Sequence, residues 1–332
     1  LRVQQTEILI CHGYKAGLIG RFAARRAGIP VIAVSRGWTG ENLRVRAYEW
    51  LDRRVLRGMD RVVCVSKAQA AKVLGKEKDV KEYEALYQGI KAAFQREYIT
   101  ATGRLVSETQ TACVLTLHFD LAQETNRARI VESLKNNLAR HNDHLVTGFV
   151  GTPYLCVVLS DNGLHELAGK VFLQHDYPSW LYAVNLGATT IWERWDSIKP
   201  DGSIDESGMN SFNHYSYGAI GHWMYTRLAG IHPVSPGYKT VLVKPQPIQG
   251  ITWVNAHTDT PYGRVSVNWK CEKHIFTADV CIPVNTHATI HLPGWEKAME
   301  VGSGDYHFEY ETEMELDIIT ETRSSHCGAL SN

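Results

Sequence analysis

The chain has 332 residues, of which 44% are hydrophobic, and this is enough to build the cores of two or three domains. Lys and Arg together number 35, as do Asp and Glu, so the formal net charge is zero. This balance argues against a nucleic-acid partner and an anionic membrane surface, which attract excess positive charge, and it favours a neutral ligand. Aromatic residues make up 10%, and their flat faces suit sugar rings, although core packing is the commoner role of any one of them.

The first 80 residues alternate between short β-branched runs and helical stretches. The runs cover residues 7–11, 30–34 and 61–65, and the helical stretches cover residues 17–27 and 42–56. Such alternation is typical of a parallel sheet with crossover helices. The charged stretch at residues 75–84 has no apolar periodicity, and we predict a junction there.

From about residue 85 to residue 232 the apolar residues recur at helical spacing. Two stripes show it best: Ile130, Val131, Leu134 and Leu138, and then Ile220, Trp223, Met224 and Leu228. We predict long loops at residues 148–154 and 193–215, and loops of this kind usually carry function.

After Pro233 the apolar period changes to two. Val265, Val267 and Trp269 alternate with polar residues, as do Ala288, Ile290 and Leu292. This alternation predicts antiparallel strands with one buried face. We therefore divide the chain into domains at residues 1–80, 84–232 and 233–326.

The seven cysteines are widely spread, with no CxxC pair and no Cys/His spacing of the kind that binds a metal. We expect reduced thiols, no metal and no cofactor. The first residues lack the pattern of a signal peptide, and no apolar run reaches the length of a membrane span. A cytoplasmic location is the simplest expectation.

Residues 176–203 hold the densest mixture of acidic and aromatic side chains. Its members are Asp176, Glu193, Asp196 and Asp201 with Trp180, Trp192 and Trp195. Inverting hydrolysis of a glycosidic bond needs one acid and one base, about 6.5 to 9.5 Å apart, and aromatic walls shape a sugar site. From the pattern alone, a surface ion pair near a helix end is the more frequent explanation of such a Glu.

Five segments of the sequence point to a known family: GRLVSETQTA (103–112), HLVTGFVGTPYL (144–155), LQHDYPSWLYAVNLGATTIWERWDSIKPDGS (173–203), MNSFNHYSYGAIGHWMY (209–225) and EVGSGDYHFEY (300–310). In order and spacing they resemble the α-L-rhamnosidases of glycoside hydrolase family 78. The resemblance covers residues 84–326 and implies part of an (α/α)6 toroid, of the six-hairpin glycosidase type, followed by an antiparallel β-sandwich. It also implies inverting hydrolysis of terminal α-L-rhamnosides without a cofactor or a metal.

The resemblance assigns roles to four residues of the chain. Glu193, in TTIWERWD, becomes the general base that activates water, and His214, in SFNHY, contacts the rhamnose. Trp180 and Trp192 become candidate walls of the sugar pocket. Without the resemblance, His214 would more often be a histidine of a core or of a helix N-terminus.

The general acid of these enzymes lies on a DxxxRDERxxWxGD-type segment, and this sequence contains none. Hydrolysis without that acid therefore remains one hypothesis. A non-catalytic carbohydrate-binding remnant, or a gene-fusion product, is the alternative. In a partial toroid, some apolar faces of the helices have no partner helix. Association of copies of the chain would cover these faces, and this is a further hypothesis.

Residues 1–74 resemble part of the N-terminal Rossmann-like α/β domain of family 4 GT-B glycosyltransferases. The matching strings lie at residues 7–56 and 59–70. The resemblance gives His12, Gly13 and Lys15 a ligand role, but Arg36 stands where such sequences often have His, and no donor-binding domain follows. A glycosyltransferase fragment is thus a further hypothesis, although a folded segment without activity is the commoner outcome.

Overall fold

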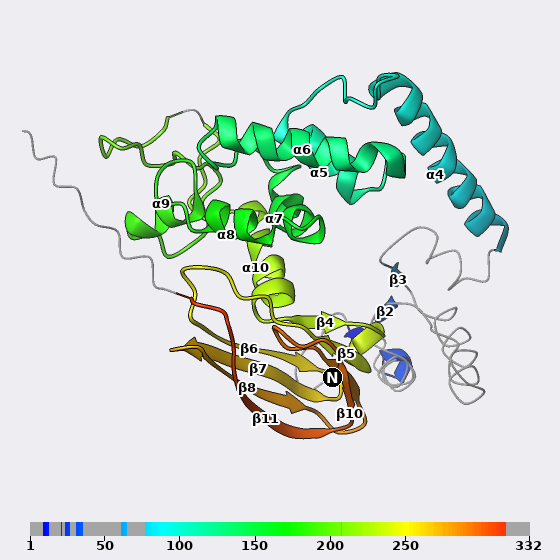
Figure 1. Cartoon of the computed structure of the whole chain (residues 1–332). Helices are drawn as coiled ribbons and strands as arrows, with labels where there is room; N and C mark the ends of the chain where they lie inside the picture. The colour runs from blue at the N-terminus through cyan, green and yellow to red at the C-terminus, as the bar shows by residue number, and fades with distance from the viewer. Residues whose placement is uncertain are drawn as a thin grey trace, which may run out of the picture.

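The computed structural model of the chain describes residues 77–206 and 208–316, together with short pieces of the first 64 residues (Figure 1). Three of those pieces are strands in one parallel sheet of order β1-β2-β3: β1 (Leu9–His12), β2 (Val31–Ser35) and β3 (Arg61–Cys64). They coincide with the three predicted β-branched runs, so the predicted parallel pairing is confirmed.

Other expectations for this region fall largely outside the described residues. Of the helix predicted at residues 17–27, only Arg21 and residues 24–26 are described, and they are helical. The helix predicted at 42–56 lies outside the described residues, as do Gly13, Lys15 and Arg36 and the side chain of His12.

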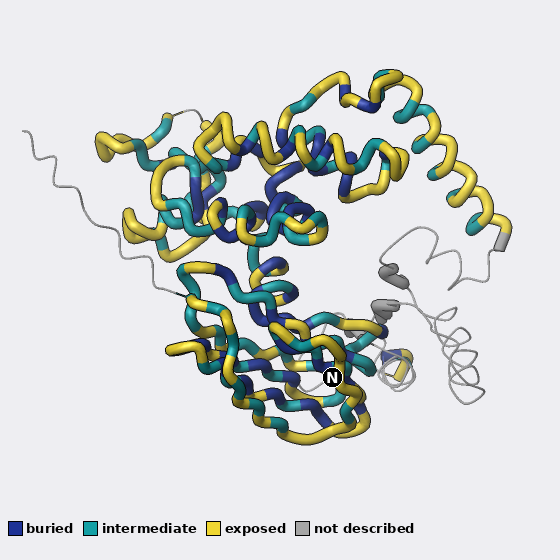
Figure 2. Tube along the Cα trace, in the orientation of Figure 1, coloured by how far each residue is buried: buried dark blue, intermediate teal, exposed yellow. Residues whose placement is uncertain are grey.

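Seven α-helices follow in the described part of the chain. They are α4 (Glu77–Tyr98), α5 (Gln110–His118), α6 (Glu124–Arg140), α7 (Thr152–Asp161), α8 (His165–Phe172), α9 (Trp180–Asn185) and α10 (Ile220–Trp223). Helix α4 extends away from the others and is exposed along most of its length (Figure 2). Because α4 begins at Glu77, most of the stretch predicted as a junction forms its first turns.

Helices α5 to α8 share one hydrophobic core with α10. The predicted stripe on α6 supplies Ile130, Leu134 and Leu138, each at most 1% exposed. Helix α5 begins where the Thr109 hydroxyl accepts a hydrogen bond from the Ala112 N–H, at 3.2 Å, because a side-chain acceptor satisfies an N–H that the first turn leaves unpaired.

Two predictions in the helical part are wrong in detail. Residues 152–154 belong to α7 and not to a loop, since Pro153 stands in its first turn, where its missing N–H costs nothing. The second predicted stripe is interrupted at Met224, which is 40% exposed. A π-helical turn at Met224–Leu228 changes the spacing there, so a regular helical period no longer predicts which face is buried.

The C-terminal part consists of two four-stranded sheets. One has the order β10-β9-β5-β4 and the other the order β11-β8-β7-β6. The strands are β4 (Ile231–Pro233), β5 (Thr240–Val243), β6 (Trp253–Thr260), β7 (Gly263–Glu272), β8 (Ile275–Ile282), β9 (His287–Ile290), β10 (Met299–Val301) and β11 (Gly304–Glu311).

The predicted alternation places the buried side chains of these strands correctly. Val265, Val267 and Trp269 on β7 are at most 2% exposed, and Ala288 and Ile290 on β9 are fully buried. They belong to one core that both sheets share. The pairing is antiparallel except between β5 and β9, which are parallel. The predicted antiparallel β-domain is thus confirmed, with this one parallel pair, because the chain passes through three strands of the other sheet between β5 and β9.

The helical and β parts pack against each other. Trp269 Nε1 donates a hydrogen bond to the Leu228 carbonyl at 2.8 Å, and the fully buried Ile248 lies against Gly169 of α8. At the crossover, Gly230 has a φ of 74°, and a Cβ there would lie 2.1 Å from the Pro245 nitrogen. Only glycine fits this position, which brings the first sheet close to the helices.

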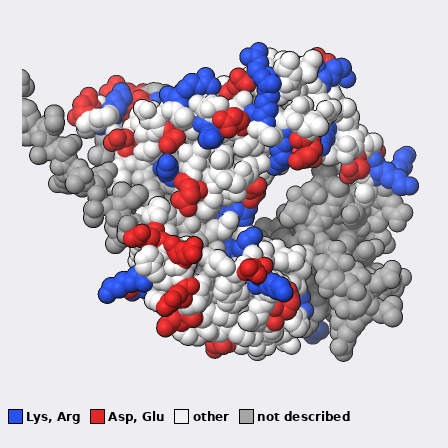
Figure 3. Space-filling view, in the orientation of Figure 1, with Lys and Arg blue, Asp and Glu red and all other residues white. Residues whose placement is uncertain are grey.

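Acidic and basic side chains lie interspersed over the face seen in Figure 3, in agreement with the zero net charge. Within the described residues, no helix has both the length and the apolar character that crossing a bilayer requires.

Candidate functional site

Two loop segments of the helical part lie side by side and bring predicted site residues together. The Glu193 N–H donates to the Ser211 carbonyl at 2.8 Å, and the His214 N–H donates to the Ile191 carbonyl at 2.8 Å. The Thr190 hydroxyl also bonds to the Phe212 carbonyl. These bonds place Glu193 and His214, far apart along the chain, on adjacent segments.

The Glu193 carboxylate is anchored at one oxygen. The Ser211 N–H donates to its Oε2 at 2.8 Å, so Ser211 binds both the backbone and the side chain of Glu193. Among the described residues, Oε1 makes no hydrogen bond, and the side chain is half-exposed. An anchored carboxylate with one open oxygen has the form that a general base requires.

The His214 ring contacts two aromatic rings. It stacks on Phe149, with centroids 4.8 Å apart at 12°, and on Tyr215, with centroids 5.0 Å apart at 15°. The Ser216 N–H donates to His214 Nδ1 at 3.3 Å. Because Nδ1 accepts this bond, the proton of a neutral ring is on Nε2, which is then the donor available to a ligand.

An aromatic cavity of about 270 Å³ lies against α9 and the loop that follows it. Its lining residues are Trp180, Ala183, Val184, Ala188, Thr189, Thr190, Ile191, Trp192, Arg194, Trp195 and Tyr217. Trp180 and Trp192 are therefore in one cavity, at 7% and 5% exposure. Glu193 and His214 are not among the residues that line it.

Aromatic contacts connect this cavity to His214. Trp195 stacks on Tyr217 at 3.8 Å and 14°, and Trp180 meets Trp195 edge-on at 5.3 Å. Phe149 lies 5.3 Å from Tyr217 on the side that leads to His214. Trp180 Nε1 also donates to the Tyr217 carbonyl at 2.9 Å, which fixes the indole. A series of aromatic contacts thus runs from the cavity to His214.

The neighbouring carboxylates are held in ion pairs. Arg194 binds both oxygens of Asp196, through Nε at 3.0 Å and Nη2 at 3.3 Å. It also lies 3.8 Å from Asp205, which pairs with Lys199 at 3.6 Å. The Asp196 hydrogen bond raises the pKa of Arg194, and burial raises the pKa of Tyr217, so Arg194 stays charged and Tyr217 stays neutral at neutral pH. Both oxygens of Asp196 are therefore occupied by the Arg194 guanidinium.

Sequence reasoning missed several residues of this site. Arg194 and Trp195 lie in the predicted cluster, but nothing in their spacing showed that they share a cavity with Tyr217. Ser211 lies in a predicted loop and in a matching segment but was not singled out, because it binds Glu193 through its backbone N–H, which every residue except proline possesses. Phe149 lies in a predicted functional loop and was not singled out.

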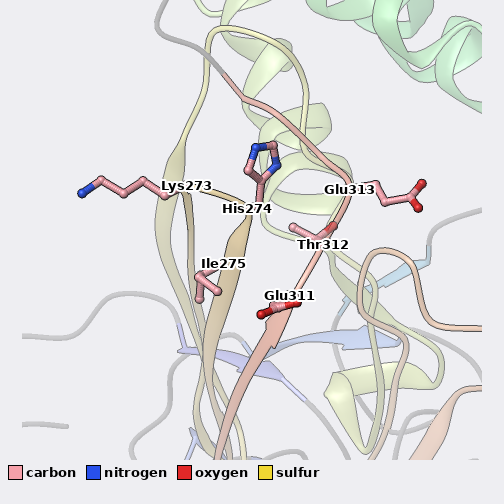
Figure 4. Close-up of a pocket in the computed structure, with 6 residues that line it drawn as sticks. All are labelled: Lys273, His274, Ile275, Glu311, Thr312 and Glu313. Atoms are coloured by element: carbon pink, nitrogen blue, oxygen red, sulfur yellow. The ribbon is translucent and has the colours of Figure 1, made fainter.

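A second hollow, of about 300 Å³, lies where the turn between β7 and β8 meets the end of β11 (Figure 4). Its walls are Lys273, His274, Ile275, Glu311, Thr312 and Glu313. The Lys273 and Glu313 side chains point away from each other into the surroundings (Figure 4). The hollow contains no aromatic wall and none of the predicted site residues. In the described part of the chain, no group of three or more His, Cys, Asp or Glu is placed to hold a metal ion.

Three family models match the chain. The bacterial alpha-L-rhamnosidase six-hairpin glycosidase domain matches residues 62–228, and the bacterial alpha-L-rhamnosidase C-terminal domain matches residues 230–307. A glycosyl transferase 4-like domain matches residues 1–81.

Individual relatives agree with these matches. An alpha-L-rhamnosidase of Formosa agariphila is 41% identical over 68% of this chain, and one of Streptomyces avermitilis is 40% identical over 68%. The matched regions are 24% and 22% of those proteins, so the chain spans about a quarter of their length.

Two solved structures are similar to the chain as well. The crystal structure of the Streptomyces avermitilis alpha-L-rhamnosidase complexed with L-rhamnose has a TM-score of 0.68 and 33% identity, over 83% of this chain and 28% of that one. The native enzyme from Aspergillus terreus has a TM-score of 0.69 and 30% identity, over 80% and 29%. At such identities the similarity extends to the sequence and is not confined to the fold.

Proposed function

Because the chain belongs to the α-L-rhamnosidase family, whose six-hairpin and C-terminal domain models match it, we propose that it hydrolyses terminal α-L-rhamnosides with inversion, using Glu193 as general base. The helical part is then a portion of an (α/α)6 toroid, and the two sheets form the β-sandwich that follows it. A relative solved with L-rhamnose supports a carbohydrate ligand for this chain.

The anchored carboxylate of Glu193 carries the proposal. Its open Oε1 accepts a proton from water, and the water oxygen forms a bond to the anomeric carbon as the bond from that carbon to the leaving oxygen breaks. The Ser211 N–H holds Oε2, so the carboxylate stays in one orientation during the transfer. His214 Nε2 donates to a hydroxyl of the sugar, and the Phe149 and Tyr215 rings keep its imidazole in place.

Protonation of the leaving oxygen is the step of this reaction for which the chain has no evident residue. No segment of the sequence resembles the general-acid motif of the family, and the nearby Asp196 is bound by Arg194 at both oxygens. Substrates whose leaving group departs as a stable anion need no proton, whereas alkyl rhamnosides do. We therefore expect activity toward 4-nitrophenyl α-L-rhamnoside and far less toward methyl α-L-rhamnoside.

The paired state of Asp196 also favours a second candidate function, carbohydrate binding without turnover. In that case the chain holds L-rhamnose beside His214, and no bond is cleaved. A shift of the melting temperature by L-rhamnose, together with no release of 4-nitrophenol, would identify this function, because a ligand that binds only the folded state stabilises it.

The test of the hydrolase compares the wild type with Glu193→Gln. The amide cannot accept the proton, so we expect kcat/KM for 4-nitrophenyl α-L-rhamnoside to fall by about 10² to 10⁴. Glu206→Gln makes the same chemical change at an exposed position of the same loop and should leave the rate unchanged. Equal rates for the wild type and Glu193→Gln would contradict the assignment of the base.

The match of residues 1–81 to a glycosyl transferase 4-like domain keeps the glycosyltransferase hypothesis open. That segment would bind a nucleotide sugar. Differential scanning fluorimetry with UDP-glucose and GDP-mannose tests this, and the absence of a shift with either would count against it.

A further inference from the structure

The aromatic cavity and the Glu193 carboxylate lie on different sides of one short segment. Trp192 and Arg194 line the cavity, whereas Glu193, between them, does not. The Glu193 side chain turns instead toward Ser211. The chain bends at Glu193 and Arg194, so the Glu193 carboxylate is directed to Ser211 while its two neighbours face the cavity. A molecule in the cavity would therefore not sit on the face where the base acts.

The walls of the cavity are mostly apolar. Trp180 and Trp192 contribute indole surface, and Ala183, Val184 and Ala188 contribute small alkyl groups. The cavity is open because the side chains of Ala183 and Ala188 are small, and a larger side chain at either position would fill it. A cavity of about 270 Å³ with such walls suits one or two fused planar rings.

The polar side chains of the lining are those of Thr189, Thr190, Arg194 and Tyr217. The Arg194 charge is balanced by Asp196, so a charged ligand gains little there. Trp195 lines the cavity too, but its indole nitrogen is enclosed in the protein and offers no hydrogen bond to a ligand.

These features discriminate between a sugar and an aromatic ring. A pyranose carries several hydroxyl groups, and each loses hydrogen bonds to water when it enters an apolar site. The cavity offers hydrogen-bond partners for only a few of these hydroxyl groups. An aromatic ring with a single hydroxyl matches the walls and the number of polar groups.

We propose that this cavity is a second ligand site, which binds one uncharged planar aromatic molecule with a single polar substituent, independently of the Glu193 site. The proposal goes beyond the hydrolysis of rhamnosides, because it requires neither turnover nor bound rhamnose. Trp180, Trp192, Trp195 and Tyr217 form its walls.

The test measures binding of 2-naphthol to the full chain by isothermal titration calorimetry. Ala188→Trp fills the cavity and should weaken the affinity by about tenfold or more, a loss of about 1.4 kcal/mol. Val184→Trp, at the 57%-exposed rim, should also weaken binding, and it keeps the test valid if the Ala188 variant does not fold. Leu186→Trp adds the same ring to the same turn at a 45%-exposed residue that does not line the cavity, and it should change the affinity by less than about twofold.

The relation to the sugar site is measured with the same probe. Saturating L-rhamnose should leave the affinity for 2-naphthol unchanged. The Glu193→Gln variant should bind 2-naphthol with the same affinity as the wild type. Failure of L-rhamnose to bind at all would remove the proposed function but leave this site intact. Absence of 2-naphthol binding to the wild type would overturn the proposal. So would equal weakening by Leu186→Trp and Ala188→Trp, or competition between the two ligands.

Discussion

The two well-described parts of the molecule differ in how completely they bury their apolar side chains. Of the 21 large hydrophobic residues that are exposed among those the structure describes, 17 lie in the helical part and four in the β part. Several of the 17 surround the candidate site, among them Phe149, Val184, Leu186, Ile191 and Tyr215. The two sheets close a core of their own, whereas the helices leave apolar surface where the ligand sites lie.

This difference shows where stability and function are concentrated. A closed sheet pair needs no partner to satisfy its inner faces, so it can act as a rigid base for the helices. An apolar surface around a loop cluster is typical of a site that binds a ligand or another surface. Changes in the β core should therefore act on stability, and changes near Glu193 should act on function.

The largest expected effect on stability is in the β core. Trp269→Ala removes a side chain that is 2% exposed and also the bond from its Nε1 to the Leu228 carbonyl, so we expect about 3 to 5 kcal/mol less unfolding free energy. Trp253→Ala makes the same change on the outer face of the same sheet, where the residue is 59% exposed, and should cost less than about 0.5 kcal/mol. Urea denaturation followed by circular dichroism measures both, and similar losses would show that the β core is not closed.

A smaller effect is expected where the two parts meet. The Ser160 hydroxyl accepts a hydrogen bond from Trp223 Nε1 at 2.8 Å and pairs with His165 Nδ1 at 2.8 Å. His165 Nε2 in turn bonds to the Gln246 carbonyl of the β part at 2.9 Å. Ser160→Ala leaves partly buried donors and acceptors unpaired and should cost about 1 to 3 kcal/mol.

The matched change for that variant is Ser203→Ala, in an exposed loop, which should be nearly neutral. Chemical denaturation of the two variants provides the comparison. A neutral Ser160→Ala would mean that this network does not couple the helical part to the β part.

The smallest expected effect is a change in the stability of the fold with pH. Burial, with the charge of Arg227 added to it, lowers the pKa of His232 on β4 to about 4. The unfolded chain, with an ordinary value of about 6.5, binds this proton more readily than the folded chain. Stability from this group is therefore full above about pH 6.5 and is lost as the pH falls from there toward 4.

Since the His232 ring is only partly buried, we expect a loss of about 1 kcal/mol between pH 7 and pH 5 after allowing for solvent screening. Thermal unfolding at the two pH values, repeated with His232→Gln, measures the contribution of this residue. The variant should show the weaker pH dependence, and an equal dependence in both proteins would contradict the assignment.

The sequence predicted most of the β part and less of the helical part, for a physical reason. On β7, burial alternates strictly with position, so Val265, Val267 and Trp269 could be assigned to the core directly. In the helical part, the π-helical turn shifted the face at Met224, and Pro153 began a helix inside a predicted loop. Both depend on local backbone geometry that apolar spacing does not record.

The candidate site shows the same limit. Glu193, His214, Trp180 and Trp192 were selected through a family resemblance and not from their spacing. No pattern in the sequence indicates that Ser211 holds the Glu193 carboxylate, since the contact uses a backbone N–H. The roles of these residues stay predictions until they are measured.

The most direct test of the account is the configuration of the sugar that the chain first releases from 4-nitrophenyl α-L-rhamnoside. Proton NMR during the first minutes of the reaction distinguishes the two anomers before they equilibrate. If Glu193 activates water for direct displacement, β-L-rhamnose appears first. Initial release of α-L-rhamnose, or no release of rhamnose at all, would contradict the proposed hydrolysis.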